Sequence, residues 1–160
     1  MGKKLVVYFT AEGGRTEALA RNVAAAAKAD LRELTPTEPY TQDDLYWPNA
    51  GCRSVVEMKT PGFFQPMKPL DVNPGDYDVI FVGFPVWCGT APTIVRTFLK
   101  ENDLAGKTVI PFCTSGGGSA PGADGDFAKY APGADLRPYT LLNRASEARV
   151  ADWVAKLGLD

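Results

Sequence analysis

The chain has 160 residues, of which 45% are apolar and 22% charged, enough for one buried core and too few for two ordinary domains. Its 17 basic and 19 acidic residues give a formal net charge of −2 without a basic block, which argues against nucleic acid as a partner. The absence of histidine excludes imidazole catalysis, and three widely spaced cysteines indicate neither a disulfide framework nor a CxxC metal or redox motif.

The first residues, Met1 to Lys4, lead directly into a strand, without the apolar region or cleavage site of a signal peptide. No apolar run reaches the length of a membrane span, so we expect no membrane association. The run Leu5–Phe9 is apolar and rich in β-branched and aromatic residues, which is typical of a strand buried on both faces of a parallel sheet. We therefore expect a cytoplasmic protein with one domain over residues 1–160 and this run as its central strand.

The next part of the chain alternates between helix and strand and then becomes irregular. Residues 16–29 are rich in Ala, Glu, Arg and Lys, with apolar residues at the spacing of one helix face, and residues 30–34 predict a short strand. The middle segment, residues 36–74, is rich in proline and shows little periodicity. Its aromatic side chains, including Tyr46 and Trp47, indicate that it packs against the domain, and we expect one short helix within it.

The second half of the chain continues the alternation. Residues 78–84 form the clearest buried strand, ended by Pro85, and residues 91–101 predict a helix with Pro92 in its first turn. Further elements are expected as a strand at 107–113, a helix at 124–130, a strand at 136–142 and a helix at 146–157. This order predicts an α/β fold, a three-layer α/β/α sandwich with a doubly wound five-stranded parallel sheet.

Three loops follow strands of this sheet, at the edge where such folds bind ligands. The first loop, residues 10–16, joins hydroxyls and glycines to a helix start, which suits a phosphate, although it matches neither the P-loop nor the dinucleotide motif. The tryptophan loop, residues 85–90, places Trp87 where a planar ligand could stack, and we prefer this interpretation to simple packing. The glycine-rich loop, residues 114–119, offers mainly backbone amides.

Three segments together resemble the flavodoxin family: residues 8–10, 77–92 and 106–118. The resemblance covers nearly the whole chain and is strongest to small bacterial flavodoxin-like proteins, whose flavin loop resembles Pro-x-Trp-Trp-Gly-Thr-Ala-Pro and whose middle segment resembles residues 38–45. It implies the flavodoxin-like strand order 2-1-3-4-5 and one non-covalently bound FMN.

The resemblance also implies where FMN would lie, with no catalytic side chain and no metal. The phosphate site would comprise Thr10, Ala11, Glu12, Gly13, Gly14, Arg15 and Thr16. The residues along the flavin ring would be Pro85, Val86, Trp87, Cys88 and Gly89. The amides facing its polar edge would be those of Thr114, Ser115, Gly116, Gly117 and Gly118.

Two positions depart from the family pattern. The first loop is one residue longer than the family pattern Ser/Thr-x-Thr-Gly-Asn-Thr. If Arg15 points inward and Glu12 outward, a bound phosphate gains a charged partner. The reverse arrangement would weaken FMN binding. Cys88 replaces the second tryptophan of the flavin loop. We interpret it as a tolerated small residue and not a redox thiol, because no neighbouring Cys, Lys or His would activate it.

The implied function is redox chemistry through FMN, either as a non-enzymatic electron carrier or as an NAD(P)H- or quinone-type oxidoreductase. Its partner would be a redox protein or a small electron donor or acceptor such as NAD(P)H or quinone. The alternative is a flavodoxin-fold binding module that has lost FMN and binds a partner or another phosphate-bearing ligand. A phosphotransfer receiver fits less well, because Pro85 and Thr114 stand where it needs an acidic strand end.

Overall fold

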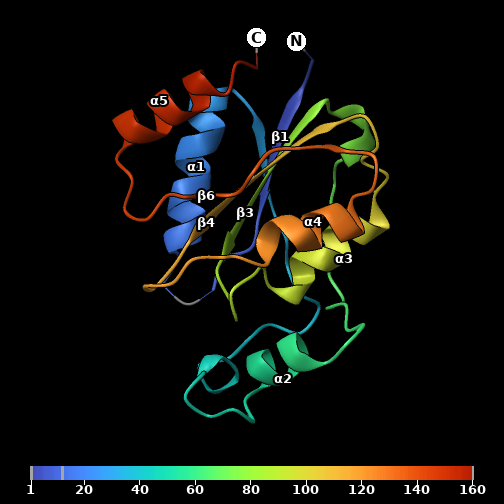
Figure 1. Cartoon of the computed structure of the whole chain (residues 1–160), viewed down its shortest axis with the longest axis vertical. Coiled ribbons are helices and arrows are strands. Elements are labelled where there is room, and N and C mark those ends of the chain that lie inside the picture. Colours follow the sequence, from blue (N-terminus) through green and yellow to red (C-terminus); the bar gives the residue numbers. More distant parts are fainter. Residues whose placement is uncertain (1, 12, 160) are drawn as a thin grey trace.

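A parallel sheet with the order β2-β1-β3-β4-β5 forms the middle layer of the computed structural model, which describes residues 2–11 and 13–159 (Figure 1). Its strands are β1 (Lys4–Tyr8), β2 (Asp30–Glu33), β3 (Val79–Pro85), β4 (Thr108–Thr114), β5 (Asp135–Leu136) and β6 (Thr140–Leu141). All pairs of neighbouring strands are parallel, and β6 pairs with β4 beyond the end of β5. The predicted doubly wound α/β sheet and its order are therefore confirmed.

The predicted fifth strand is divided into β5 and β6, which corrects the expectation of one continuous strand at 136–142. Along β4 the register advances three residues from Val109 to Phe112, while the partner advances four from Leu136 to Thr140. One residue is therefore extra on the edge strand, which is how a bulge interrupts a ladder. Pro138 lies in this interruption and has no N–H to donate to the sheet.

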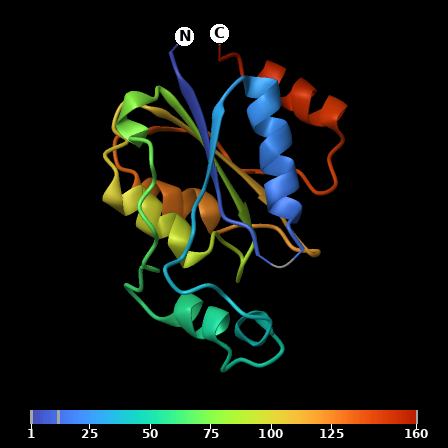
Figure 2. The same cartoon turned by 180° about the vertical axis from the view of Figure 1, so that it is seen from behind.

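Helices cover both faces of the sheet (Figures 1 and 2). One face carries α1 (Arg15–Ala27) and α5 (Glu147–Lys156), and the other carries α3 (Thr93–Glu101) and α4 (Ala123–Tyr130). In β1, Leu5 belongs to the core under α3 and α4, whereas Val6 belongs to the core under α1 and α5. The unbroken apolar runs of the central strands are explained by this burial on both faces.

The observed helices differ from the predicted ones mainly at their ends. Helix α1 stops at Ala27 because Lys28 adopts a left-handed conformation with φ of 56°. Helix α3 starts at Thr93, so Pro92 is its N-cap and not part of its first turn. Helix α5 is capped by Ser146, whose hydroxyl accepts the Arg149 amide at 3.1 Å. Among the described helices, none is long and apolar enough to cross a membrane.

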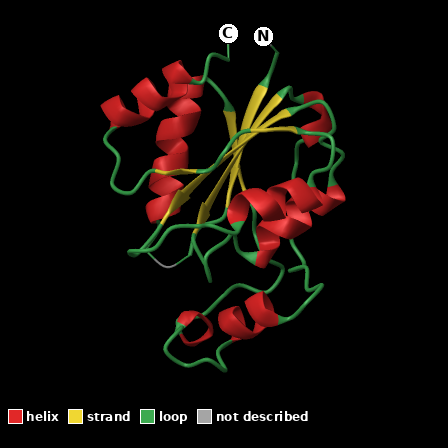
Figure 3. Cartoon of the chain, in the orientation of Figure 1, coloured by secondary structure: helices red, strands yellow, loops and turns green. Residues whose placement is uncertain are grey.

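The middle segment lies beyond the carboxyl ends of the strands, where their arrowheads point in Figure 3. It contains the short helix α2 (Arg53–Lys59), as expected, and the 3₁₀ turn η1 (Asp43–Leu45); a second turn, η2 (Pro74–Asp76), leads to β3. The Lys68 amide donates to Thr35 at 2.8 Å, which closes the base of the segment. Tyr46 is 61% and Trp47 77% exposed, so the expectation that these two aromatic residues pack down is wrong.

Polar contacts hold the middle segment together around the buried carboxylate of Glu57. Tyr40 donates its hydroxyl to this carboxylate, Gln65 Nε2 donates at 3.0 Å and Arg53 Nε donates at 2.9 Å. Burial and this carboxylate raise the pKa of the Tyr40 hydroxyl. The backbone of Gln65 accepts the Thr97 hydroxyl of α3 at 2.8 Å, which fastens the segment to the domain.

Candidate functional site

The first loop, the tryptophan loop and the glycine-rich loop meet at the carboxyl edge of the sheet. Between them is a cavity of about 110 Å³, here called the edge cavity. The residues lining it are Thr10, Ala11, Arg15, Thr16, Pro85, Val86, Thr114, Ser115 and Gly116. All of them are among the residues that the sequence assigned to a flavin, so the fold brings parts of all three loops to one place.

The start of α1 leaves backbone donors available beside this cavity. Its N-cap, Gly14, has φ of 63°, the preceding Gly13 has φ of 92°, and no side chain among residues 2–11 and 13–159 caps the helix. Within this described part of the chain, the amides of the first helical turn have no side-chain partner, and the positive end of the helix dipole favours an anion there. Arg15 borders the same cavity, as expected if its side chain, and not that of Glu12, faces the phosphate. Glu12 itself lies outside the described residues.

Two contacts fix the walls of the edge cavity. The hydroxyls of Thr16 and Thr114, both buried, are 2.8 Å apart and connect the start of α1 to the end of β4. The amide of Val86 donates to the Thr114 carbonyl at 2.8 Å and connects the tryptophan loop to the same strand end. The relative positions of the three loops are thus set by hydrogen bonds at Thr114.

Trp87 packs against neighbouring aromatic rings and is not among the residues that line the edge cavity. Its half-buried ring makes edge-to-face contacts with Phe9 at 5.4 Å and Tyr40 at 5.3 Å between centroids. Reciprocal backbone bonds with Thr90, of 2.9 and 3.0 Å, hold the turn that follows. In this structure Trp87 therefore supports the tryptophan loop and attaches it to the middle segment through Tyr40.

The three cysteines differ in exposure, which predicts different reactivity. Cys88 is exposed in the turn of the tryptophan loop, while Cys52 and Cys113 are buried, and all three are free thiols. Burial, with a smaller contribution from the Asp124 carboxylate, raises the pKa of the Cys113 thiol to about 12.

At about pH 8 we expect a disulfide reagent to titrate one thiol rapidly in the folded protein and all three after denaturation. Loss of the fast phase in Cys88→Ser checks the assignment, and a fast phase retained in that variant contradicts it.

The glycine-rich loop already uses some of its amides internally. The Ser115 hydroxyl accepts the amides of Gly117 at 3.1 Å and Gly118 at 2.7 Å, while the Ser115 amide donates to Asn143 Oδ1 at 2.7 Å. Gly116 borders the edge cavity, and its amide donates to no described side chain. To use the amides of Gly117 and Gly118, a ligand would have to displace the Ser115 hydroxyl. Asn143 was missed in the sequence, although its position directly after a predicted strand was an available signal.

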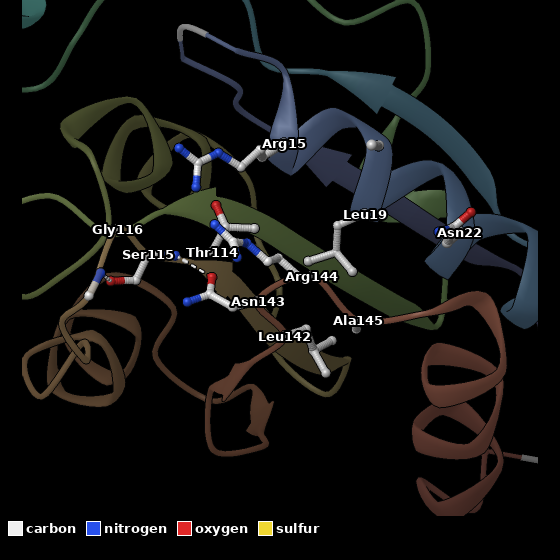
Figure 4. A pocket seen from close by; sticks show the side chains of 12 residues that line it. Arg15, Leu19, Asn22, Thr114, Ser115, Gly116, Leu142, Asn143, Arg144 and Ala145 are labelled. Atoms are coloured by element: carbon white, nitrogen blue, oxygen red, sulfur yellow. Dashed lines mark hydrogen bonds between the residues drawn. The ribbon is translucent and has the colours of Figure 1, made fainter.

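A second and larger cavity, of about 460 Å³, continues from the edge cavity between α1 and the turn joining β6 to α5. It is called the arginine cavity here, because Arg15 and Arg144 both border it, and Figure 4 shows both side chains extending toward Thr114. The two cavities share Arg15, Thr114 and the start of the glycine-rich loop. Sequence analysis assigned no role to Arg144.

Comparison with known proteins places the chain in a family. The family model described as flavodoxin matches residues 3–157, and no curated protein matches. A candidate flavoprotein from Bacteroides eggerthii is 39% identical over 100% of both chains, with a TM-score of 0.91. Another from Bacteroides uniformis is 39% identical over 96% of this chain and 98% of that one, with a TM-score of 0.90. A flavoprotein from Lactobacillus acidophilus, solved in complex with FMN, shares the fold at 23% identity and a TM-score of 0.67, over 96% and 99% of the chains.

Proposed function

This chain belongs to the flavodoxin family, and from that premise we propose that it binds one FMN non-covalently and transfers electrons through it. The observation that carries the proposal is the edge cavity, where the start of α1, which no described side chain caps, and Arg15 meet residues from the ends of β3 and β4. Such a donor set fits a phosphate dianion. The Lactobacillus flavoprotein with FMN adds an example of this cofactor on the same fold.

We assign the phosphate to the first loop. Backbone amides at the start of α1 would donate to its oxygens, and the Arg15 guanidinium would supply charge-assisted hydrogen bonds. The hydroxyls of Thr10 and Thr16 border the same cavity. The left-handed backbone of Gly13 and Gly14 would keep the loop in a shape that exposes these amides, with open space where a Cβ would project.

We assign the flavin ring to the space between the tryptophan loop and the glycine-rich loop. Pro85 and Val86 border one side of the edge cavity and Gly116 borders another. FMN, when bound, would supply the electron acceptance and donation that ordinary amino-acid side chains do not provide. The protein's part is then to hold the phosphate, orient the ring and leave one side of it accessible to a donor or acceptor. That role fits an electron carrier as well as an NAD(P)H- or quinone-type oxidoreductase.

The test is to purify the protein without added flavin, record its visible spectrum and chromatograph the released chromophore against FMN and FAD. We expect about one FMN per chain, or saturable quenching of FMN fluorescence when the colourless protein is titrated. Bleaching of the bound flavin by a chemical reductant and its recovery in air would show that it cycles. A colourless protein that neither quenches FMN nor binds it calorimetrically would overturn the proposal in favour of a binding module without FMN.

A further inference from the structure

The arginine cavity contains a second arginine, Arg144, which does not border the cavity assigned to the flavin phosphate. Arg15 borders both cavities, but Arg144 borders the arginine cavity alone. Neither guanidinium has an acidic partner among the described residues, and none of the residues lining the arginine cavity is acidic. With Arg15 assigned to the flavin phosphate, Arg144 remains as an unused anion-binding group at the neighbouring position.

The size and lining of the arginine cavity point to an organic ligand and not to a bare ion. Its volume of about 460 Å³ lies in the range of small-molecule sites, roughly 300–1,000 Å³. Ala18 of α1 and Ala145 before α5 supply apolar surface from the two sides, and the buried Leu19 and Leu142 contribute a smaller part. Asn22 and Asn143 add amide groups that can bond the edge of a polar ring or a sugar hydroxyl. An anion attached to a partly apolar, hydrogen-bonding body fits this combination.

The backbone also directs Arg144 to this place. It adopts φ of 50°, a left-handed conformation that is uncommon for a residue other than glycine. The preceding residue, Asn143, is held by the Ser115 amide at 2.7 Å, so the turn is fastened to the glycine-rich loop. Figure 4 shows the Arg144 side chain extending back over the end of β4 and not out along α5.

We propose that the arginine cavity is a second ligand subsite, which binds the phosphate of a nucleotide at Arg144 and its nucleoside between α1 and the β6–α5 turn. The inference rests on the proposed function only in assigning the neighbouring edge cavity to a flavin phosphate. Two sources offer this chemistry. The nucleotide is either the adenylate half of FAD, continuing from the flavin phosphate through the shared Arg15, or a separate nucleotide bound beside FMN.

The experiment uses 5′-AMP as the probe, titrated calorimetrically into the protein with and without saturating FMN, and adenosine as the probe that lacks phosphate. FMN and FAD are titrated in parallel. Arg144→Gln is the test variant, and Arg149→Gln is its control, because Arg149 is exposed on α5 and does not border the cavity. We expect Arg144→Gln to weaken nucleotide binding about tenfold and FMN binding less than about twofold, with the control unchanged.

AMP binding to the FMN-loaded protein, with adenosine weaker and Arg144→Gln impaired, would establish a separate nucleotide. Tighter binding of FAD than of FMN, with the difference lost in Arg144→Gln, would establish the adenylate of a dinucleotide. The proposal is overturned if AMP does not bind and FAD has no advantage, if both arginine variants behave alike, or if Arg144→Gln weakens FMN as much as the nucleotide. Failure of FMN to bind rejects only the proposed function, because AMP titration of the flavin-free protein still tests the subsite.

Discussion

Replacing Gly83 with alanine should lower the free energy of unfolding by about 1–3 kcal/mol, as expected for one methyl group forced into a packed core. Gly83 lies in β3 directly opposite Phe112 of β4, and a Cβ at this position would be 2.5 Å from two atoms of the Phe112 ring. The ring has little freedom to move, because it is fully buried and contacts Trp153 of α5 at 6.1 Å between centroids. The strain would fall on the packing between the central sheet and α5.

Chemical denaturation of Gly83→Ala measures the decrease in the free energy of unfolding. Gly125→Ala is the control, for which an increase is expected. Gly125 lies in α4, is exposed, and has open space around a Cβ, so alanine there should stabilise the protein by about 0.5–1 kcal/mol. A double-mutant cycle with Phe112→Leu identifies the clash. Phe112→Leu should cost less in the Gly83→Ala background than alone, and strict additivity of the two changes would contradict the steric explanation.

The sequence predicted best those elements whose local residue pattern follows directly from burial. The central strands are unbroken apolar runs because both faces of the sheet are covered, and this burial is visible in a run such as Leu5–Phe9 without any tertiary information. The end of α1 was placed two residues too late because Lys28, and not a glycine, takes the left-handed conformation that stops it. The division between β5 and β6 depends on pairing with β4, which a local pattern does not contain.

The candidate site was predictable to the level of loops, not of side-chain directions. Positions after strands identified the three loops that meet at the edge cavity. The orientation of Trp87, however, depends on Phe9 and on Tyr40, a residue far away in the sequence. The structure of the middle segment was equally hard to predict, because Glu57 holds it through polar contacts with Tyr40 and Gln65 that residue spacing does not reveal. Aromatic content alone wrongly predicted that Trp47 is buried.

Arg15→Glu should weaken FMN binding about 100-fold while leaving the fold intact. The change removes a charge-assisted hydrogen bond, which contributes about 1.5–3 kcal/mol, and it adds repulsion between the new carboxylate and the phosphate. A 100-fold loss of affinity corresponds to about 2.7 kcal/mol. Arg15 is exposed, and its side chain forms no ion pair with a described residue. Glutamate in the first turn of α1 is favoured by the helix dipole, so the free energy of unfolding should remain equal or rise slightly.

Fluorescence titration with FMN measures the effect, and riboflavin, which lacks the phosphate, separates charge from shape. Riboflavin affinity should be the same in Arg15→Glu and the parent protein if Arg15 acts only through the phosphate. Arg149→Glu is the matched control, since it makes the same charge change in the first turn of α5, where Arg149 is exposed and away from both cavities. Added salt should weaken FMN binding to the parent more than to Arg15→Glu, because it screens an attraction that only the parent has. Equal FMN affinities in the two arginine variants would exclude Arg15 from the phosphate site and leave the backbone amides of α1 as its main donors.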